Sequence, residues 1–331
     1  MMHRNTRKTI LLYLLTIFIC SCNKEVDLVD DYKDHPIVYG IIDANDSISY
    51  IRIQKAFQSE GHLYEDAQIA DSNIYPYKLD VSLKSGNRII KFDTITIANK
   101  EEGTFFSPNY PIYYAPTKNL LNIDLPLELE IRNPKTGHVA KSTTKLMDAS
   151  KLDIIRPVFV VSLSENFGID YYSLENISTY QLIIRFHYME MIPDDSSSIV
   201  YKYTDITNEL RRSKTLYGEE ILRNIFQPDV FFYRINKTIA PTQELVRYNG
   251  KLELIIKTIE DSFYTYSENH QASGSALEHQ NIYSNIENGY GIFAGKSSKS
   301  HFVRIDNLSK LILMDLEGLN FMGSLPEEEQ P

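Results

Sequence analysis

Apolar and polar residues alternate with period two along much of this chain, and this pattern most constrains how it can fold. The clearest runs are residues 79–84 and 127–132, in which every second residue is aliphatic. Successive side chains of a strand point to opposite faces, so these runs predict strands with one buried face. We therefore expect a mostly β fold.

Turn residues follow both runs and predict β-hairpins. Ser85-Gly86-Asn87 leads into an apolar run at 88–92, and Asn133-Pro-Lys-Thr-Gly137 turns the chain after the second run. Glycine and asparagine accept the backbone conformations that tight turns need. Two earlier strand-like runs, 37–42 and 50–54, are predicted to pair in the same way.

The strand signals divide into two groups. Residues 36–148 predict an immunoglobulin-like β-sandwich, because their length and strand spacing suit that fold. A short polar break, Asp148-Ala149-Ser150, precedes residues 151–323, which predict a β-rich α+β domain with short helices. Helical spacing and flanking signals predict these helices at about Gly218 to Phe226, ending before Pro228, and at about Thr258 to Glu268.

The chain begins with the pattern of an export signal. Arg4, Arg7 and Lys8 precede the apolar run 9–19. Eleven helical residues span only about 16 Å, whereas a bilayer core is about 30 Å thick. Residues 1–21 therefore predict a cleaved signal peptide and not a permanent membrane span.

Ile19-Cys20-Ser21-Cys22 resembles the lipobox of bacterial lipoproteins. The resemblance implies that Cys22 becomes the first mature residue and carries an acyl chain such as palmitate, which anchors the protein to a membrane. The alternative is a chance cysteine behind a secretory signal. Residues 22–35 then form an acidic tether, and residues 324–331 are expected to be a disordered acidic tail.

Composition argues against several function classes. Removal of the three basic signal residues lowers the net charge from −10 to −13, so nucleic acid is not an expected partner. The Gly291–Ser297 segment lacks the first glycine of a phosphate-binding loop, because position 290 is tyrosine. The sequence contains neither a His-Glu-x-x-His zinc motif nor a Gly-x-Ser-x-Gly elbow. We therefore predict no catalytic residue, no metal and no cofactor, and expect that the protein is not an enzyme.

The aromatic residues permit two interpretations. The chain has 23 tyrosines, 15 phenylalanines and no tryptophan. Tyrosine clusters at 110–114 and 171–172 would form a glycan-binding surface if their rings were exposed. The favoured interpretation is that these tyrosines occupy half-buried strand positions.

Several segments resemble one protein family. The segment Tyr283–Gly295 follows an opening at 38–41, a strand at 50–53 and a strand-then-helix passage at 255–266. In this order and spacing they resemble an uncharacterised family of Bacteroidota outer-membrane lipoproteins, a domain of unknown function. The resemblance implies an outer-membrane location and frequent association with TonB-dependent transporters, and it supplies no catalytic residue. The charged residues of 24–27 also resemble cell-surface export signals, which leaves periplasmic and surface-facing orientations open.

Together these observations predict a non-catalytic, lipid-anchored envelope protein that is an accessory of a TonB-dependent outer-membrane transport system. The alternative is a surface module that binds a glycan or a peptide. The candidate contact residues are Asn285, Gly289, Gly291 and Gly295, which combine glycines with polar residues. Their alternative role is to permit turns or close backbone approach.

Overall fold

A computed structural model describes residues 35–59, 62–98, 106, 109–155, 160–271 and 283–324. Half of the chain is strand and 15% is helix, so the expectation of a mostly β fold with a few short helices is confirmed. The strands form one large sheet and two smaller ones.

The large sheet has 11 strands, and its main path runs in the order β12, β11, β15, β16, β1, β2, β6 and β5. Its strands are β1 Pro36–Asp43, β2 Ile48–Lys55, β5 Asp93–Ile97, β6 Tyr110–Pro116, β9 Val160–Val161, β11 Thr179–Ile192, β12 Asp195–Thr207, β13 Arg211–Arg212, β15 Val246–Ile259, β16 Tyr290–Ile305 and β17 Phe321–Ser324. The predicted pairing of the first two strands is confirmed, because β1 and β2 are antiparallel neighbours.

A second sheet has the strand order β4, β3, β7 and β8. It comprises β3 Asp80–Ser85, β4 Arg88–Lys91, β7 Leu127–Arg132 and β8 Val139–Thr144. β3 pairs with β4, and β7 pairs with β8, so both predicted hairpins are confirmed. The third sheet contains only β10 Phe167–Tyr172 and β14 Ile221–Phe226.

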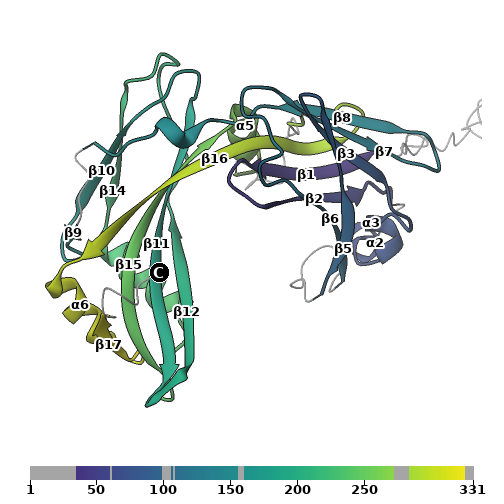
Figure 1. The fold of residues 1–331 in the computed structure, drawn as a ribbon. Helices are drawn as coiled ribbons and strands as arrows, with labels where there is room; N and C mark the ends of the chain where they lie inside the picture. The colour runs from purple at the N-terminus through teal and green to yellow at the C-terminus, as the bar shows by residue number, and fades with distance from the viewer. Residues whose placement is uncertain are drawn as a thin grey trace, which may run out of the picture.

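One strand connects the two halves of the molecule. The first part of β16 pairs in parallel with β1, from Tyr290 to Lys296. Its later part pairs antiparallel with β15, from Lys296 to Val303. Figure 1 shows this strand running from the N-terminal half into the C-terminal half, so that the large sheet continues through both.

The hydrophobic residues form two clusters. The N-terminal cluster lies between β1, β2 and β6 on one side and the second sheet on the other, and it also includes Ile286 and Phe293. The C-terminal cluster begins at Ala149 and covers one face of β11 and β15. β16 contributes to both clusters. The division into domains at 36–148 and 151–323 stays a prediction.

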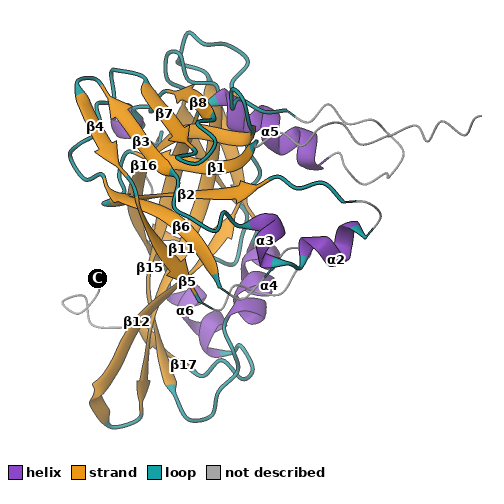
Figure 2. Cartoon of the chain, turned by 90° about the vertical axis from the view of Figure 1, so that its right-hand side faces the viewer, coloured by secondary structure: helices purple, strands orange, loops and turns teal. Residues whose placement is uncertain are grey.

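Helices cover the C-terminal cluster. Phe231 and Ile235 of α4 and Leu313 of α6 are buried in it, and Figure 2 shows both helices beside the C-terminal sheet. The helices are α2 Leu63–Ala67, α3 Ala70–Asn73, α4 Pro228–Thr238, α5 Asp261–Gln271, α6 Asn307–Met314 and the 3-10 turn η1 Ala149–Lys151. In the described ranges, no helix combines the length and apolar character needed to span a membrane.

The helix expected at about Gly218 to Phe226 is wrong, because residues 221–226 form strand β14. The burial pattern alternates, with Leu222, Asn224 and Phe226 inside. The buried amide of Asn224 donates to the Tyr171 hydroxyl of β10 at 3.2 Å, which fixes this strand against its partner. Pro228 begins α4 instead of ending a helix, as suits a residue without an amide hydrogen.

The helix expected at about Thr258 to Glu268 exists but begins later, as α5 at Asp261. Thr258 still belongs to β15, and its hydroxyl donates to the Met147 carbonyl at 3.2 Å. Thr258 therefore does not cap this helix. Glu260 caps the helix instead, because its carboxylate accepts from the Ser262 amide at 3.1 Å.

Candidate docking surface

The C-terminal part of the large sheet has one face covered by the C-terminal cluster and an opposite face that carries polar and exposed aromatic side chains beside the buried Ile183 and Ile255. Leu182, Ile184 and Phe186 of β11 point into the C-terminal cluster, as the alternation of this strand predicts. Arg185 and His187 alternate with these residues in sequence and therefore lie on the opposite face. We call this opposite face of β12, β11, β15 and β16 the open face (Figure 1).

A row of charged side chains crosses the open face. The register places Arg185 opposite Asp205 on one side and Glu253 on the other. Arg185 donates from Nε and Nη2 to the two carboxylate oxygens of Asp205, at 2.7 and 2.9 Å. These bonds outweigh partial burial and raise the pKa of Arg185. The planar fork of arginine suits such a bidentate contact, so the pair is fixed in orientation.

Glu253 collects the other polar contacts of this row. It lies 3.8 Å from an Arg185 nitrogen and 3.0 Å from His187 Nε2. The Ser300 hydroxyl of β16 donates to its second oxygen at 2.6 Å. Side chains of four neighbouring strands thus satisfy one another, and the row carries little unpaired charge.

Exposed aromatic rings flank the charged row. Tyr201 and Tyr203 of β12 are 52% and 57% exposed, and Phe302 of β16 is 48% exposed. The Arg185 guanidinium stacks over Tyr203 at 4.0 Å. The centre of the His187 ring lies 6.2 Å from the centre of the Tyr203 ring and 6.0 Å from that of the Phe302 ring.

The composition of this face resembles that of protein interfaces. Tyrosine and arginine carry much of the binding energy at protein interfaces. The carboxylates of Asp205 and Glu253 accept hydrogen bonds from Arg185 and Ser300. In the part of the chain that the structure describes, no three His, Cys, Asp or Glu residues are placed to hold a metal ion.

The predicted contact residues have structural surroundings. The Asn285 side chain bonds both backbone groups of Phe293, at 2.9 and 2.7 Å. Gly291 and Gly295 are buried, and a Cβ atom on either would overlap a backbone carbonyl, of Val38 or Lys145. A Cβ on Gly289 would also press on the backbone of Pro36. These glycines permit close approach of neighbouring chain segments; a contact role for the segment stays a prediction.

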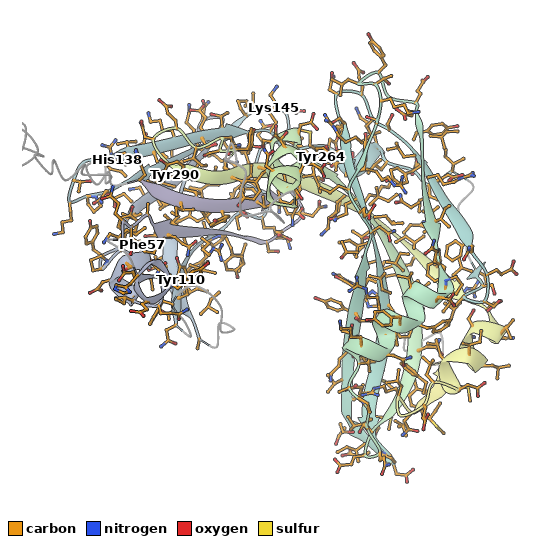
Figure 3. All side chains as sticks on the ribbon, turned by 180° about the vertical axis from the view of Figure 1, so that it is seen from behind. Phe57, Tyr110, His138, Lys145, Tyr264 and Tyr290 are labelled. Carbon is orange, nitrogen blue, oxygen red and sulfur yellow. The ribbon has the colours of Figure 1, made fainter. Side chains whose placement is uncertain are left out.

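The exposed part of this segment lies at the outer end of the N-terminal half. Tyr290 is 46% exposed, and Figure 3 shows it beside His138, far from the C-terminal sheet. The rings of His35 and His138 contact each other at 5.3 Å, and both bond the Asn288 carbonyl. A partner that binds this segment would contact Asn288 and Tyr290, because Gly291 and Gly295 are buried.

The tyrosine clusters follow the favoured interpretation. Tyr110, Tyr113 and Tyr171 are almost fully buried, whereas Tyr172 is 47% exposed. Burial raises the pKa of Tyr171 to about 12 despite a hydrogen bond from Asn224. These rings build the core. Cys22, by contrast, lies outside the described residues, as do the signal peptide and the tail after Ser324.

Sequence patterns alone do not identify the residues of the open face as a site. Arg185 and His187 interrupt an apolar run, which places them on a polar face. Asp205 lies 20 residues from Arg185, and Glu253 lies 66 residues from His187. Only the register of three strands brings these groups together. A comparison with protein-family models finds no match, and a search of curated proteins finds none at the significance threshold.

Proposed function

We propose that this chain is a non-catalytic, lipid-anchored envelope protein that docks on a TonB-dependent outer-membrane transporter as an accessory. The observation that carries the proposal is the open face, where Tyr201, Tyr203 and Phe302 stay exposed around a charge row that is already paired. A surface of this composition suits a protein partner. The predicted export signal and the family resemblance support an outer-membrane setting.

We also propose that the N-terminal half is an immunoglobulin-like sandwich. Two sheets of that half share one hydrophobic cluster, which supports this assignment. The parallel pairing of β1 with β16 adds a strand from beyond the predicted domain boundary. An experimental structure in which the two sheets cross at about 30° would support it, and a near-perpendicular crossing would contradict it.

One observation favours the alternative of a surface glycan-binding module. A pocket of about 220 Å³ in the N-terminal half is lined by Tyr75, Tyr77 and Tyr113 together with two prolines. Tyrosine faces of this kind stack on sugar rings. A saturable glycan-array signal that Tyr75→Ala and Tyr77→Ala abolish, together with no recovered transporter, would favour this alternative.

The predicted anchor has a direct test. Cys22→Ala is expected to abolish incorporation of labelled palmitate and to move the protein from the membrane fraction to the soluble fraction. The physical reason is that a soluble domain without its acyl chain loses most of its membrane affinity. Uptake of palmitate by the variant would contradict the prediction. Cys20→Ala is the matched control, because Cys20 lies in the segment that is predicted to be removed.

A further inference from the structure

We propose that β12 is a docking edge, onto which an extended segment of the partner protein adds as a further strand. The inference rests on the proposed function, and it names the contact and the conformation of the bound segment. The backbone edge of β12 and the side chains on either side of it carry the argument.

The strand is an unusually long edge. β12 has 13 residues and, among the residues that the structure describes, pairs only with β11. Edge strands of soluble proteins are usually short, because their free N–H and C=O groups can pair with another chain. At the other end of the sheet path, β5 has only 5 residues. Figure 1 shows β12 as the outermost strand of the C-terminal half.

The usual protections of an edge are missing from residues 200–207 of this strand, and a register shift lies only nearer its start at Asp195. β12 contains no proline, and its register with β11 runs without a shift from Val200 to Thr207. The two charged residues of this stretch do not guard the edge, because both are engaged within the chain. Lys202 forms an ion pair with Glu190, and Asp205 binds Arg185. The edge is therefore close to neutral and open to pairing.

Side chains beside the edge define the partner's chemistry. Tyr201 and Tyr203 lie two residues apart and share the open face, while Val200, 50% exposed, points to the other face. Cross-strand neighbours on one face contact each other directly. An added strand would therefore present apolar or aromatic residues at alternate positions toward the two tyrosines. Its backbone would supply the donors and acceptors that match the edge, as in other cases of strand addition.

A random dodecapeptide display library, selected on the full chain purified in detergent from its native membranes, tests this inference. Enriched peptides are then synthesised and titrated against three proteins. These are the wild type, the edge variant Val200→Lys/Tyr201→Lys and the control Leu308→Lys/Leu311→Lys. The control removes similarly exposed apolar residues from α6, 52% and 56% exposed, and leaves every strand unchanged. Thermal unfolding of each variant checks that it is folded.

We expect the edge variant to bind the peptides at least about tenfold more weakly, because lysines on both faces disfavour strand addition. The control should bind like the wild type. Methylation of alternate backbone amides removes the hydrogen-bond donors of one edge of the peptide at a time. Only methylation of the edge that pairs with β12 should abolish binding, since an added strand pairs through one edge. Either equal binding to both variants or equal sensitivity of both peptide edges would overturn the inference.

Two further outcomes would also overturn it. One is a library that yields no peptide above the level of the empty matrix. The other is a full chain that is dimeric and that the edge variant, but not the α6 control, converts to a monomer, since a second copy would then occupy β12. These results do not depend on the transporter, so they distinguish failure of this inference from failure of the proposed function.

Discussion

Arg247→Met is expected to lower the free energy of unfolding by about 3–5 kcal/mol, because it breaks a buried ion pair. Arg247 and Glu190 are both almost fully buried, and Arg247 Nε donates to the carboxylate at 2.8 Å. The other guanidinium nitrogens donate to the carbonyls of Leu319 and Ala240, at 2.7 and 2.8 Å. One side chain thus joins β11 to the segments that follow α4 and α6, and methionine would leave these acceptors without their donor.

Urea denaturation of the soluble Cys22→Ala form measures this effect. Arg223→Met is the control, because Arg223 also makes short contacts with a carboxylate, that of Asp170, but on the surface. Exposed ion pairs contribute little, so this variant should unfold close to the wild type. Equal destabilisation by the two variants would contradict the assignment of Arg247 as the buried tie of this half.

The same ion pair predicts a pH dependence. Burial alone would raise the pKa of Glu190, but hydrogen bonds from Lys202 and Arg247 outweigh it and hold the pKa below its usual range. A carboxyl with a lowered folded pKa contributes stability that is present above its unfolded pKa. That contribution is lost as the pH falls through the lower folded value. Glu190→Gln should therefore flatten the acid limb of the stability profile.

Gly295→Ala is expected to cost about 3 kcal/mol or more, at the upper end of overpacking effects. A Cβ atom on Gly295 would overlap the carbonyl of Lys145, which is backbone and has no rotamer by which to move away. The position is also tied by hydrogen bonds, because its amide donates to the Thr144 hydroxyl at 2.8 Å and its carbonyl accepts from Glu260 at 3.0 Å. The alanine variant must therefore shift β16 where the two halves meet.

Gly168→Ala is the matched control for this effect. It also lies in a strand, and a Cβ there would make only ordinary contacts, the nearest to the Arg223 side chain at 3.5 Å. It should change the urea midpoint little. A Gly295→Ala midpoint equal to that of Gly168→Ala would show that the approach of β16 to β8 is looser than described.

Local patterns predicted the hairpins because all the needed information is contiguous. In β3 and β4, the alternating residues and the turn lie within 80–91, so pairing follows from neighbours in sequence. The prediction for β14 was wrong because its apolar residues fit both helical and strand spacing. These residues are Ile221, Leu222, Ile225 and Phe226. Its partner β10 lies about fifty residues earlier, and only that pairing decides between the two periods. Tertiary pairing thus overrode local spacing.

Local sequence patterns could not predict the candidate surface, for a related reason. Arg185 predicts a polar strand face, but nothing near it in sequence indicates that Asp205 and Glu253 lie opposite it. The edge position of β12 likewise depends on the order of strands in the sheet, which involves β1 and β16 at opposite ends of the chain. Composition argued only against some function classes, whereas the proposed docking edge rests on the strand order.

Membrane anchoring would strengthen a modest interface. A protein that is tethered beside its partner meets it at a high effective concentration, so weak docking suffices for occupancy. The open face and the β12 edge are neighbouring parts of one sheet, and a partner segment on the edge would lie next to Tyr201 and Tyr203. This proximity allows one partner to use both features.

The amount of TonB-dependent transporter that co-purifies with the tagged full chain from native membranes tests the proposed function most directly. We predict that the wild type and the Leu308→Lys/Leu311→Lys control recover the transporter, and that Val200→Lys/Tyr201→Lys recovers at most about a tenth as much. Equal recovery by all three proteins would keep the proposed function and contradict the docking edge. Recovery of no transporter by the wild type, at expression levels that match the native protein, would contradict the proposed function itself.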